Sequence, residues 1–254
     1  MTSLIGDAPV DGVDVAALLG IPISAEQERA VQAPLKPCAV IAGAGTGKTT
    51  VMAARVVWLV ASRLVSPEEI LGLTFTNKAT AELSERIESN LTRVGLLTSE
   101  QPRPTVATYD SFAGTLVNDY GAWDGINTGA HLITAARAYQ LAAEVIMGLN
   151  KAPLAATHMG PTFIAQAVVK LAGAMASHDA SPGKVRRADA RWRQMLLDAP
   201  TKRGGDRYAD IDKWLSRVDE REELLDLVAA YQNLKKERGL VEFGDRMVQA
   251  LHLV

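Results

Sequence analysis

The sequence predicts an α/β protein in which a parallel sheet with crossover helices is joined to an all-α insertion. Two observations predict this fold class. Up to about residue 119, short apolar runs alternate with segments of helical periodicity, which is the order of strands and helices in a parallel sheet. Beyond that residue, strand-like runs disappear, alanine is frequent and apolar residues recur at helical spacing. We therefore expect a sheet-based first part and a helical middle part.

The first part is expected to open with a lead-in and a short helix. Residues 1–20 are polar and then weakly helical. Ser24 is followed three residues later by Gln27, which is the pattern of a capping box. A helix is therefore predicted to begin at Ser24 and to run to about residue 32, where two prolines follow.

The remaining elements of the first part alternate in type. The apolar run 38–42 precedes a glycine-rich turn and is expected to be a buried parallel strand, with Cys38 as a buried, inert thiol. A further buried strand is then predicted over 70–75 and a third strand over 104–108, with helices over 48–62 and 78–91.

The middle part is predicted to hold four helices, over 130–148, 161–177, 188–198 and 211–237. A loop rich in glycine, lysine and arginine at 200–207 separates the last two. From Gly183 to Arg207 the chain holds eight Lys or Arg against three Asp, a local excess of five positive charges. This basic stretch has two open interpretations, a contact with a polyanion or a solvated helix face and loop.

The overall composition limits the classes of function. The 254 residues carry a net charge of −2, so no global positive field indicates a nucleic-acid partner. The single cysteine excludes an internal disulfide and a cysteine-based metal site. The sequence has no signal-peptide pattern, and no apolar run approaches the ~20 residues that span a bilayer. We therefore expect a cytoplasmic protein that does not contact a membrane.

Residues 42–49 predict a phosphate-binding loop, or P-loop, between a strand and a helix. The glycines let backbone N–H groups converge on phosphate oxygens, and the following helix directs its positive end at the same place. Lys48 is the expected catalytic residue, which reaches the β- and γ-phosphates, and the Thr49 hydroxyl is the expected Mg²⁺ ligand. The residues expected to bind nucleotide here are Gly43, Ala44, Gly45, Thr46, Gly47, Lys48, Thr49 and Thr50. The alternative is a glycine-rich turn without a ligand.

The P-loop begins with Ala42, where the general motif has glycine, and in this form it resembles the loop of superfamily-1 DNA helicases of the UvrD/Rep/PcrA type. That resemblance implies a RecA-like P-loop NTPase fold. Residues 24–31 resemble the family's Q motif, which implies that Gln27 hydrogen-bonds adenine. Residues 239–245 resemble the segment that returns the chain from the helical insertion to the motor core.

Residues 73–83 resemble the family's motif Ia, which contacts single-stranded DNA. The implied DNA contacts are Phe75, Thr76, Asn77 and Lys78. They also make chemical sense, because an aromatic ring can stack on a base while the three polar side chains reach phosphates. The alternative is a strand end with a buried phenylalanine and a helix cap supplied by Thr76 or Asn77.

Two further positions depart from the family's pattern. Residues 105–112 resemble motif Ib, but Tyr109 and Asp110 stand where the family usually has Phe-His. Because Asp110 is acidic, Thr108 and Ser111 are the better candidates for DNA contacts. Many relatives have arginine where this chain has Thr50, so any nucleotide contact of that arginine is missing or supplied elsewhere.

The resemblance also implies cofactors, partners and a division into domains. It implies ATP and Mg²⁺, single-stranded DNA and single-strand/double-strand junctions, and the remaining helicase domains of a parent chain. Residues 52–61 resemble actinobacterial AdnAB-type subunits, which implies a possible partner helicase–nuclease subunit. The expected domains are a lead-in (1–22), an incomplete RecA-like ATP-binding domain 1A (23–120 and 226–254) and a helical insertion domain 1B (121–225).

A P-loop motor also needs an apolar strand that ends in Asp-Glu. The pair Asp219-Glu220 lies in a charged helical run, so we interpret it as a solvated helix face. The chain is therefore expected to act in DNA repair or recombination as part of an ATP-dependent helicase, and to hydrolyse ATP hardly at all by itself. A non-motor P-loop protein that binds nucleotide or DNA as a regulator is the main alternative. A small-molecule kinase is a third, which the match to motif Ia disfavours.

Overall fold

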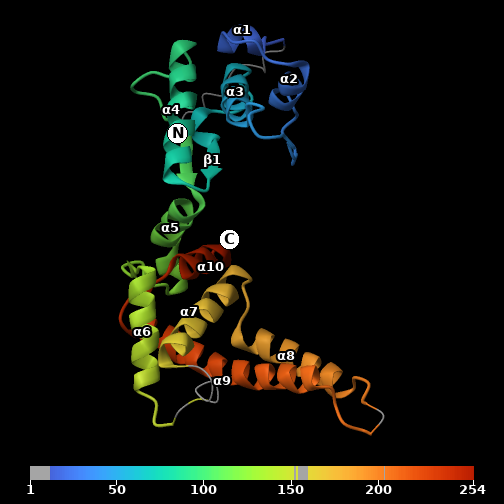
Figure 1. Ribbon diagram of the computed structural model, residues 1–254. Coiled ribbons are helices and arrows are strands. Elements are labelled where there is room, and N and C mark those ends of the chain that lie inside the picture. The colour runs from blue at the N-terminus through green and yellow to red at the C-terminus, as the bar shows by residue number, and fades with distance from the viewer. Residues whose placement is uncertain (1–11, 152, 154–159, 203) are drawn as a thin grey trace. The chain divides into compact units, whose positions relative to one another are not determined.

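The computed structural model describes residues 12–151, 153, 160–202 and 204–254 (Figure 1). Residues 1–11 of the predicted lead-in and Arg203 of the basic stretch lie outside the described residues. The chain forms two compact units that divide between Phe112 and Ala113, and we refer to them as unit 1 and unit 2. Among the described helices, none combines the length and the apolar character of a membrane span.

Unit 1 is built on helices that enclose one apolar core. Its elements are α1 (Val15–Leu19), α2 (Ala25–Val31), α3 (Lys48–Ala61), the 3₁₀ turn η1 (Pro67–Glu69) and α4 (Asn77–Arg93). Apolar side chains repeat on one face of each helix, and burying these faces together stabilises the unit. Its buried members include Val15, Val31, Val57, Leu83, Ile87 and Leu91. The helices predicted over 24–32, 48–62 and 78–91 are therefore confirmed within a few residues.

Two parallel strands run beside α4 in unit 1. Strand β1 (Leu71–Thr74) pairs with β2 (Thr105–Thr108), with Leu71 opposite Thr105. Parallel neighbours need a crossover connection, and α4 supplies it, lying beside β1 in Figure 1. Both strands therefore end at the same edge of the sheet, which brings Phe75 and Tyr109 together. The strands predicted over 70–75 and 104–108 are confirmed, but the burial predicted for the first is wrong, because Leu71 is exposed and the other residues of β1 are only half-buried.

The strand predicted over residues 38–42 is wrong. This segment has no strand structure, and the Ile41 side chain is 99% exposed. A strand needs a hydrogen-bonded neighbour for its backbone. In the described residues β1 pairs with β2, and no strand pairs with 38–42. The expectation of a buried thiol at Cys38 fails for the same reason, because Cys38 is exposed.

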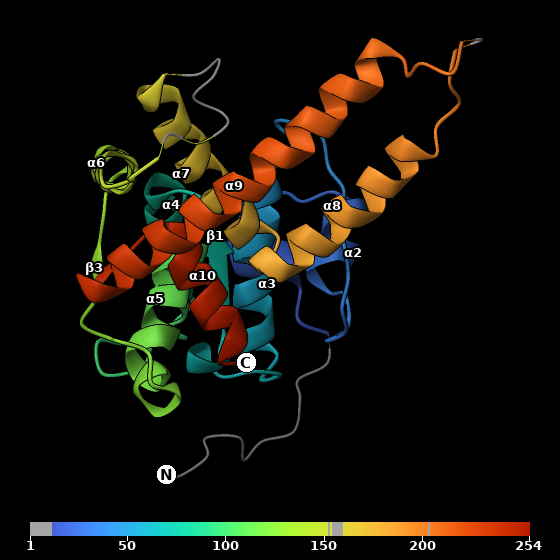
Figure 2. The same cartoon turned by 90° about the horizontal axis from the view of Figure 1, so that it is seen from below.

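Unit 2 is a group of packed helices. Helix α5 (Tyr109–Tyr120) contains the division between the units, and the 3₁₀ turn η2 (Gly121–Asp124) follows it. The remaining helices are α6 (Ala135–Met147), α7 (Pro161–Ser177), α8 (Pro182–Leu197), α9 (Ala209–Glu237) and α10 (Phe243–His252). Helices α6, α7 and α9 share a core that contains Leu141, Ile164, Val168, Leu225 and Tyr231. Figure 2 shows α8 lying along α9.

Three sequence predictions in unit 2 need correction. Strands do not disappear after residue 119, because β3 (His131–Leu132) pairs in parallel with β4 (Leu240–Val241). The first predicted helix begins at residue 135 instead of 130, since the Thr134 side chain caps it. Helix α8 begins at Pro182 instead of residue 188, since proline suits the first helical position and Ser181 caps it.

The predicted division into domains places residues 226–254 with residues 23–120, whereas residues 226–254 lie in unit 2. That division stays a prediction.

Candidate functional site

The P-loop closes with a sharp turn before α3. Gly45 and Gly47 have φ of 76° and 81°, in the left-handed region that favours glycine. Gly47 is the N-cap of α3, so the N–H groups of its first turn face the loop. The Thr46 hydroxyl donates to the Gly43 carbonyl at 2.9 Å and closes the turn. The loop therefore has the backbone form that the sequence pattern predicts for anion binding.

Lys48 lies over the loop that precedes it. Its ammonium donates to the carbonyl oxygens of Gly43 at 2.5 Å and Ala42 at 3.3 Å. A cavity of about 300 Å³ lies beside this ammonium. Its lining brings together residues of the loop, of α3 and of α4, namely Gly45, Gly47, Lys48, Thr49, Thr50, Glu82 and Arg86.

Gln27 connects α2 to the P-loop. Its side-chain oxygen accepts from the Ser24 N–H at 2.9 Å, which completes the predicted capping box. The other end of the same amide, Nε2, donates to the Thr46 carbonyl at 3.1 Å. Both ends of the side chain are thus engaged and Gln27 lies against the P-loop, while its contact with adenine stays a prediction.

Arg55 fixes α2 in place from α3. Its guanidinium donates to the carbonyl oxygens of Val31, the last residue of α2, at 2.8 Å and of Ala33, just beyond that helix, at 2.7 Å. It also donates to the Pro34 carbonyl at 3.3 Å. Cations are favourable at a helix C-terminus, where carbonyl groups lack intrahelical partners. Arg55 therefore holds the helix that carries Gln27.

Arg86 is a residue of the cavity that sequence reasoning missed. It projects from α4 and donates to the Thr50 hydroxyl at 2.9 Å. It also contacts Glu82, one helical turn earlier, at 3.4 Å. No signal in the sequence identifies Arg86, because its contact with Thr50 depends on how α4 packs beside α3.

A second group of predicted residues lies at the edge where β1 and β2 end. Phe75 is 89% exposed, and its ring centroid lies 5.1 Å from that of Tyr109. The interpretation of Phe75 as a buried strand end is therefore wrong. Tyr109 was not among the DNA contacts predicted from the sequence, and the structure pairs its ring with that of Phe75.

The polar residues of this edge have local roles that can coexist with a ligand. Thr76 accepts from the Ala79 N–H at 3.1 Å and caps α4. Asn77 and Lys78 follow in the first turn of α4 and are exposed. Thr108 accepts from the Ser111 N–H at 3.1 Å, and its hydroxyl lies 2.9 Å from that of Ser111. Asp110 stands in the first turn of α5, where a negative charge is favourable.

Carboxylates pair with four of the described basic residues of α8 and the loop after it. Arg186 donates to Glu222 and to Asp226, each at 2.6 Å, and its hydrogen bond to Glu222 raises the pKa of the guanidinium. Ion pairs also join Arg193 to Asp219, Arg207 to Asp212 at 3.3 Å and Lys184 to Asp179 at 3.5 Å. Asp219 and Glu220 lie on helix α9, as predicted. These pairs reduce the local charge excess that a polyanion would meet.

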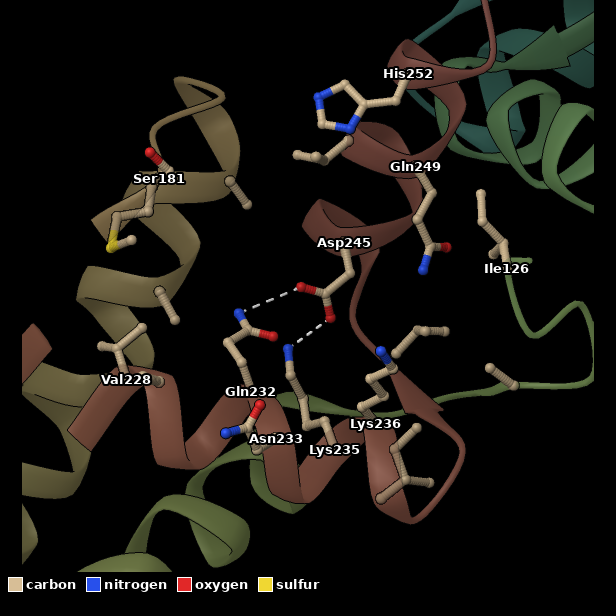
Figure 3. A pocket seen from close by; sticks show the side chains of 18 of the residues that line it. Ile126, Ser181, Val228, Gln232, Asn233, Lys235, Lys236, Asp245, Gln249 and His252 are labelled. Carbon is tan, nitrogen blue, oxygen red and sulfur yellow. Dashed lines mark hydrogen bonds and ion pairs between the residues drawn. The ribbon is translucent and has the colours of Figure 1, made fainter. Parts of the chain in front are cut away.

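A larger cavity of about 670 Å³ lies in unit 2, among α7, α9 and α10. Figure 3 shows Asp245 of α10 facing Gln232 and Lys235 of α9. Lys235 is buried and donates to Glu242 at 2.6 Å and to Asp245 at 2.5 Å. These polar groups satisfy one another, so we place the candidate site at the P-loop cavity instead, where Lys48 faces the space.

Comparisons with known proteins agree with the motifs of this site. A family described as "UvrD/REP helicase N-terminal domain" matches residues 23–254. The chain is 48% identical over 65 residues to the ATP-dependent DNA helicase UvrD1 of Mycobacterium leprae, covering 26% of this chain and 8% of the relative. It is 34% identical over 130 residues to UvrD1 of Mycobacterium bovis, covering 51% and 16%. It is 43% identical over 81 residues to DNA helicase II of Haemophilus influenzae, covering 32% and 11%.

Proposed function

Because the chain belongs to the family of UvrD/REP helicase N-terminal domains, we propose that it is the ATP-binding portion of an ATP-dependent DNA helicase or translocase acting in repair or recombination. The observation that carries this proposal is the pairing of a P-loop cavity with an exposed aromatic edge in one unit. A kinase needs the first feature but has no use for the second.

At the P-loop we propose that ATP binds with magnesium. The triphosphate would take the place of the carbonyl groups at the Lys48 ammonium, because a charged phosphate is the stronger acceptor. Thr49 would hold Mg²⁺ through its hydroxyl. One protein oxygen suits this ion, since Mg²⁺ commonly keeps several waters and takes the other ligands from phosphates. Gln27 would exchange one of its amide partners for adenine.

At the aromatic edge we propose that single-stranded DNA binds. Phe75 and Tyr109 would stack on bases, and Thr76, Asn77, Lys78, Thr108 and Ser111 would reach the phosphates. Stacking on aromatic side chains does not depend on sequence, which suits an enzyme that moves along any strand. The edge lies at the carboxyl ends of parallel strands, where open α/β sheets bind ligands.

The activity of the whole protein is likewise a proposal, because the chain covers 8–16% of the length of these three relatives. We propose that residues 23–120 and 226–254 belong to domain 1A and residues 121–225 to domain 1B of a cytoplasmic motor. ATP would close two RecA-like domains on the strand, and hydrolysis would reopen them. The chain alone would hydrolyse ATP hardly at all. Single-strand/double-strand junctions, the remaining helicase domains and a helicase–nuclease subunit are the proposed partners.

Fluorescence anisotropy with a labelled single strand tests the DNA part of the proposal. Phe75→Ala should weaken binding by about 1–3 kcal/mol, the usual contribution of one base stack. Lys78→Ala should weaken binding and reduce its salt dependence, since one phosphate contact is lost. Phe163→Ala and Lys170→Ala are matched controls, because both side chains are exposed on α7 in unit 2. Binding that falls equally in the controls, or in none of the variants, would contradict the proposed edge.

A further inference from the structure

We propose that Arg86 is a second phosphate-binding cation of the P-loop cavity, which donates to the nucleotide's phosphates from α4. This inference rests on the proposed nucleotide site and adds a residue from a different helix to it. Arg86 lines the same cavity as Lys48 and Thr49. Arg86 is also the one arginine among the residues that line this cavity.

The position of the guanidinium is set by Thr50. Nη1 of Arg86 donates to the Thr50 hydroxyl at 2.9 Å, at the third residue of α3. The hydrogen bond holds the planar group next to the first turn of the helix that carries Lys48 and Thr49. An anion bound at that turn therefore lies beside two cations that approach from different elements.

The carboxylate partner of Arg86, Glu82, is easily exchanged for a phosphate. Its ion pair with Glu82 is long, at 3.4 Å, and the two side chains are 38% and 55% exposed. Exposed pairs of this kind are worth only about 0.2–0.5 kcal/mol. A guanidinium has five N–H donors in a fixed fork that matches phosphate oxygens. A phosphate can therefore replace Glu82 without disturbing the bond to Thr50.

The charges around the cavity favour an anion. Lys48 and Arg86 contribute two positive charges and Glu82 one negative charge, which leaves a net charge of +1 on the lining side chains. The N-terminal end of α3 adds a partial positive charge. The lining thus suits a polyphosphate better than a neutral nucleoside.

The alternative is that Arg86 only ties α4 to α3 through Thr50. Thr50→Val separates the two roles, because it removes the hydrogen bond and keeps the guanidinium. Arg86→Gln removes the charge and keeps a polar side chain. Arg86→Lys keeps the charge but loses the planar fork. Arg103→Gln is a matched control, since Arg103 also pairs with a carboxylate in unit 1, that of Glu88, and does not line the cavity.

The test measures the displacement of a fluorescent ADP analogue from the 254-residue chain by AMP, ADP, ATP and inorganic tripolyphosphate, with Mg²⁺ present. Arg86→Gln should weaken the binding of ATP and of tripolyphosphate about tenfold or more, as expected for the loss of a charge-assisted hydrogen bond. The same variant should weaken the binding of AMP less. Arg86→Lys should give an intermediate loss. Thr50→Val removes one hydrogen bond that positions the guanidinium, so it should weaken ATP binding less than Arg86→Gln does, and thermal unfolding would verify that each variant is folded.

Three results would overturn the inference. The first is Arg86→Gln binding ATP as Arg103→Gln does. The second is Thr50→Val losing as much affinity as Arg86→Gln. The third is an equal loss for AMP and tripolyphosphate. If the unmodified chain binds no nucleotide, or if Lys48→Ala binds as well as it does, then the proposed function itself fails. If Lys48→Ala loses nucleotide affinity and Arg86→Gln does not, then the role of Arg86 fails while the proposed nucleotide site stands.

Discussion

The side-chain amide of Gln27 donates a hydrogen bond of 3.1 Å to the carbonyl oxygen of Thr46, and so joins the end of one helix to the phosphate-binding loop. A methyl group added at Gly47 would lie 3.2 Å from the same amide nitrogen. The contact is therefore close, and a side chain at position 47 would require the Gln27 amide to move.

Replacing Gln27 by alanine should weaken Mg·ATP binding about fivefold, because a neutral hydrogen bond contributes about 1 kcal/mol. The loss should be larger for ATP than for GTP if the same amide recognises adenine. Isothermal titration calorimetry with both nucleotides measures it. Gln32→Ala is the control, since the side-chain amide of Gln32 donates to Glu28, one turn earlier in the chain. Equal affinity of Gln27→Ala and Gln32→Ala for ATP would show that the contact has no role.

Arg55 should be a major source of stability in unit 1. Replacing it by methionine keeps an apolar stem but leaves the carbonyl groups of Val31 and Ala33 without their charged donor. The free energy of unfolding should fall by about 2 kcal/mol, which urea unfolding followed by circular dichroism measures. Arg29→Met, at an exposed position on α2, should change it by less than about 0.5 kcal/mol. Similar losses in the two variants would contradict this role.

Lys235 should be the most costly single charge to remove from unit 2. Its side chain is 2% exposed and lies between Glu242 and Asp245. Lys235→Met leaves two partly buried carboxylates facing each other, which should lower the free energy of unfolding by about 3–5 kcal/mol. Lys236→Met, the exposed neighbour, should have little effect. The triple variant Lys235→Met, Glu242→Gln, Asp245→Asn should recover part of the loss, and no recovery would mean that packing, not charge, sets the cost.

Tyr231 predicts a fall in stability at high pH. Burial, with its hydrogen bond to Glu242, raises the pKa of this phenol well above the ordinary value of 10.0. The phenol therefore stays protonated in the folded chain while it ionises in the unfolded chain. Its contribution is fully present below pH 10 and decreases as the pH rises above that value.

Absorbance at 295 nm separates this tyrosine from the other four in the chain. In the folded state up to about pH 11, Tyr231→Phe should leave the tyrosinate signal unchanged. In urea, the same variant should lose one fifth of the signal. A loss of signal in the folded state would show that the phenol titrates normally.

The sequence predicts local features of this fold better than distant pairings. Helix α7 matches the range predicted for it, because Pro161 fixes its first position and apolar residues repeat along it. The Ser24–Gln27 capping box was likewise predicted, since both partners lie within one turn. Strand formation at 38–42 was predicted wrongly, because a strand depends on a neighbour that local sequence does not specify. Strands β3 and β4 were missed because His131 pairs with Leu240, more than a hundred residues later in the chain.

In the candidate site, too, local features could be predicted from the sequence and contacts between distant residues could not. The glycine pattern predicts the turn at Gly45 and Gly47 because the left-handed backbone conformation favours that residue type. The pairing of Phe75 with Tyr109 follows from the shared edge of two strands and could be predicted only together with their register. The contact between Arg86 and Thr50 depends on how α4 packs on α3, and the spacing of residues in the sequence does not predict that packing.

The most direct test of the proposed nucleotide site is a calorimetric titration of the 254-residue chain with Mg·ATP, repeated with Lys48→Ala. We expect saturable binding with one site per chain in the unmodified protein. We also expect a loss of at least about tenfold in affinity when the Lys48 ammonium is removed, because that charge would face the triphosphate. No binding by the unmodified chain, or equal binding by a folded Lys48→Ala variant, would contradict the claim that the P-loop is a nucleotide site.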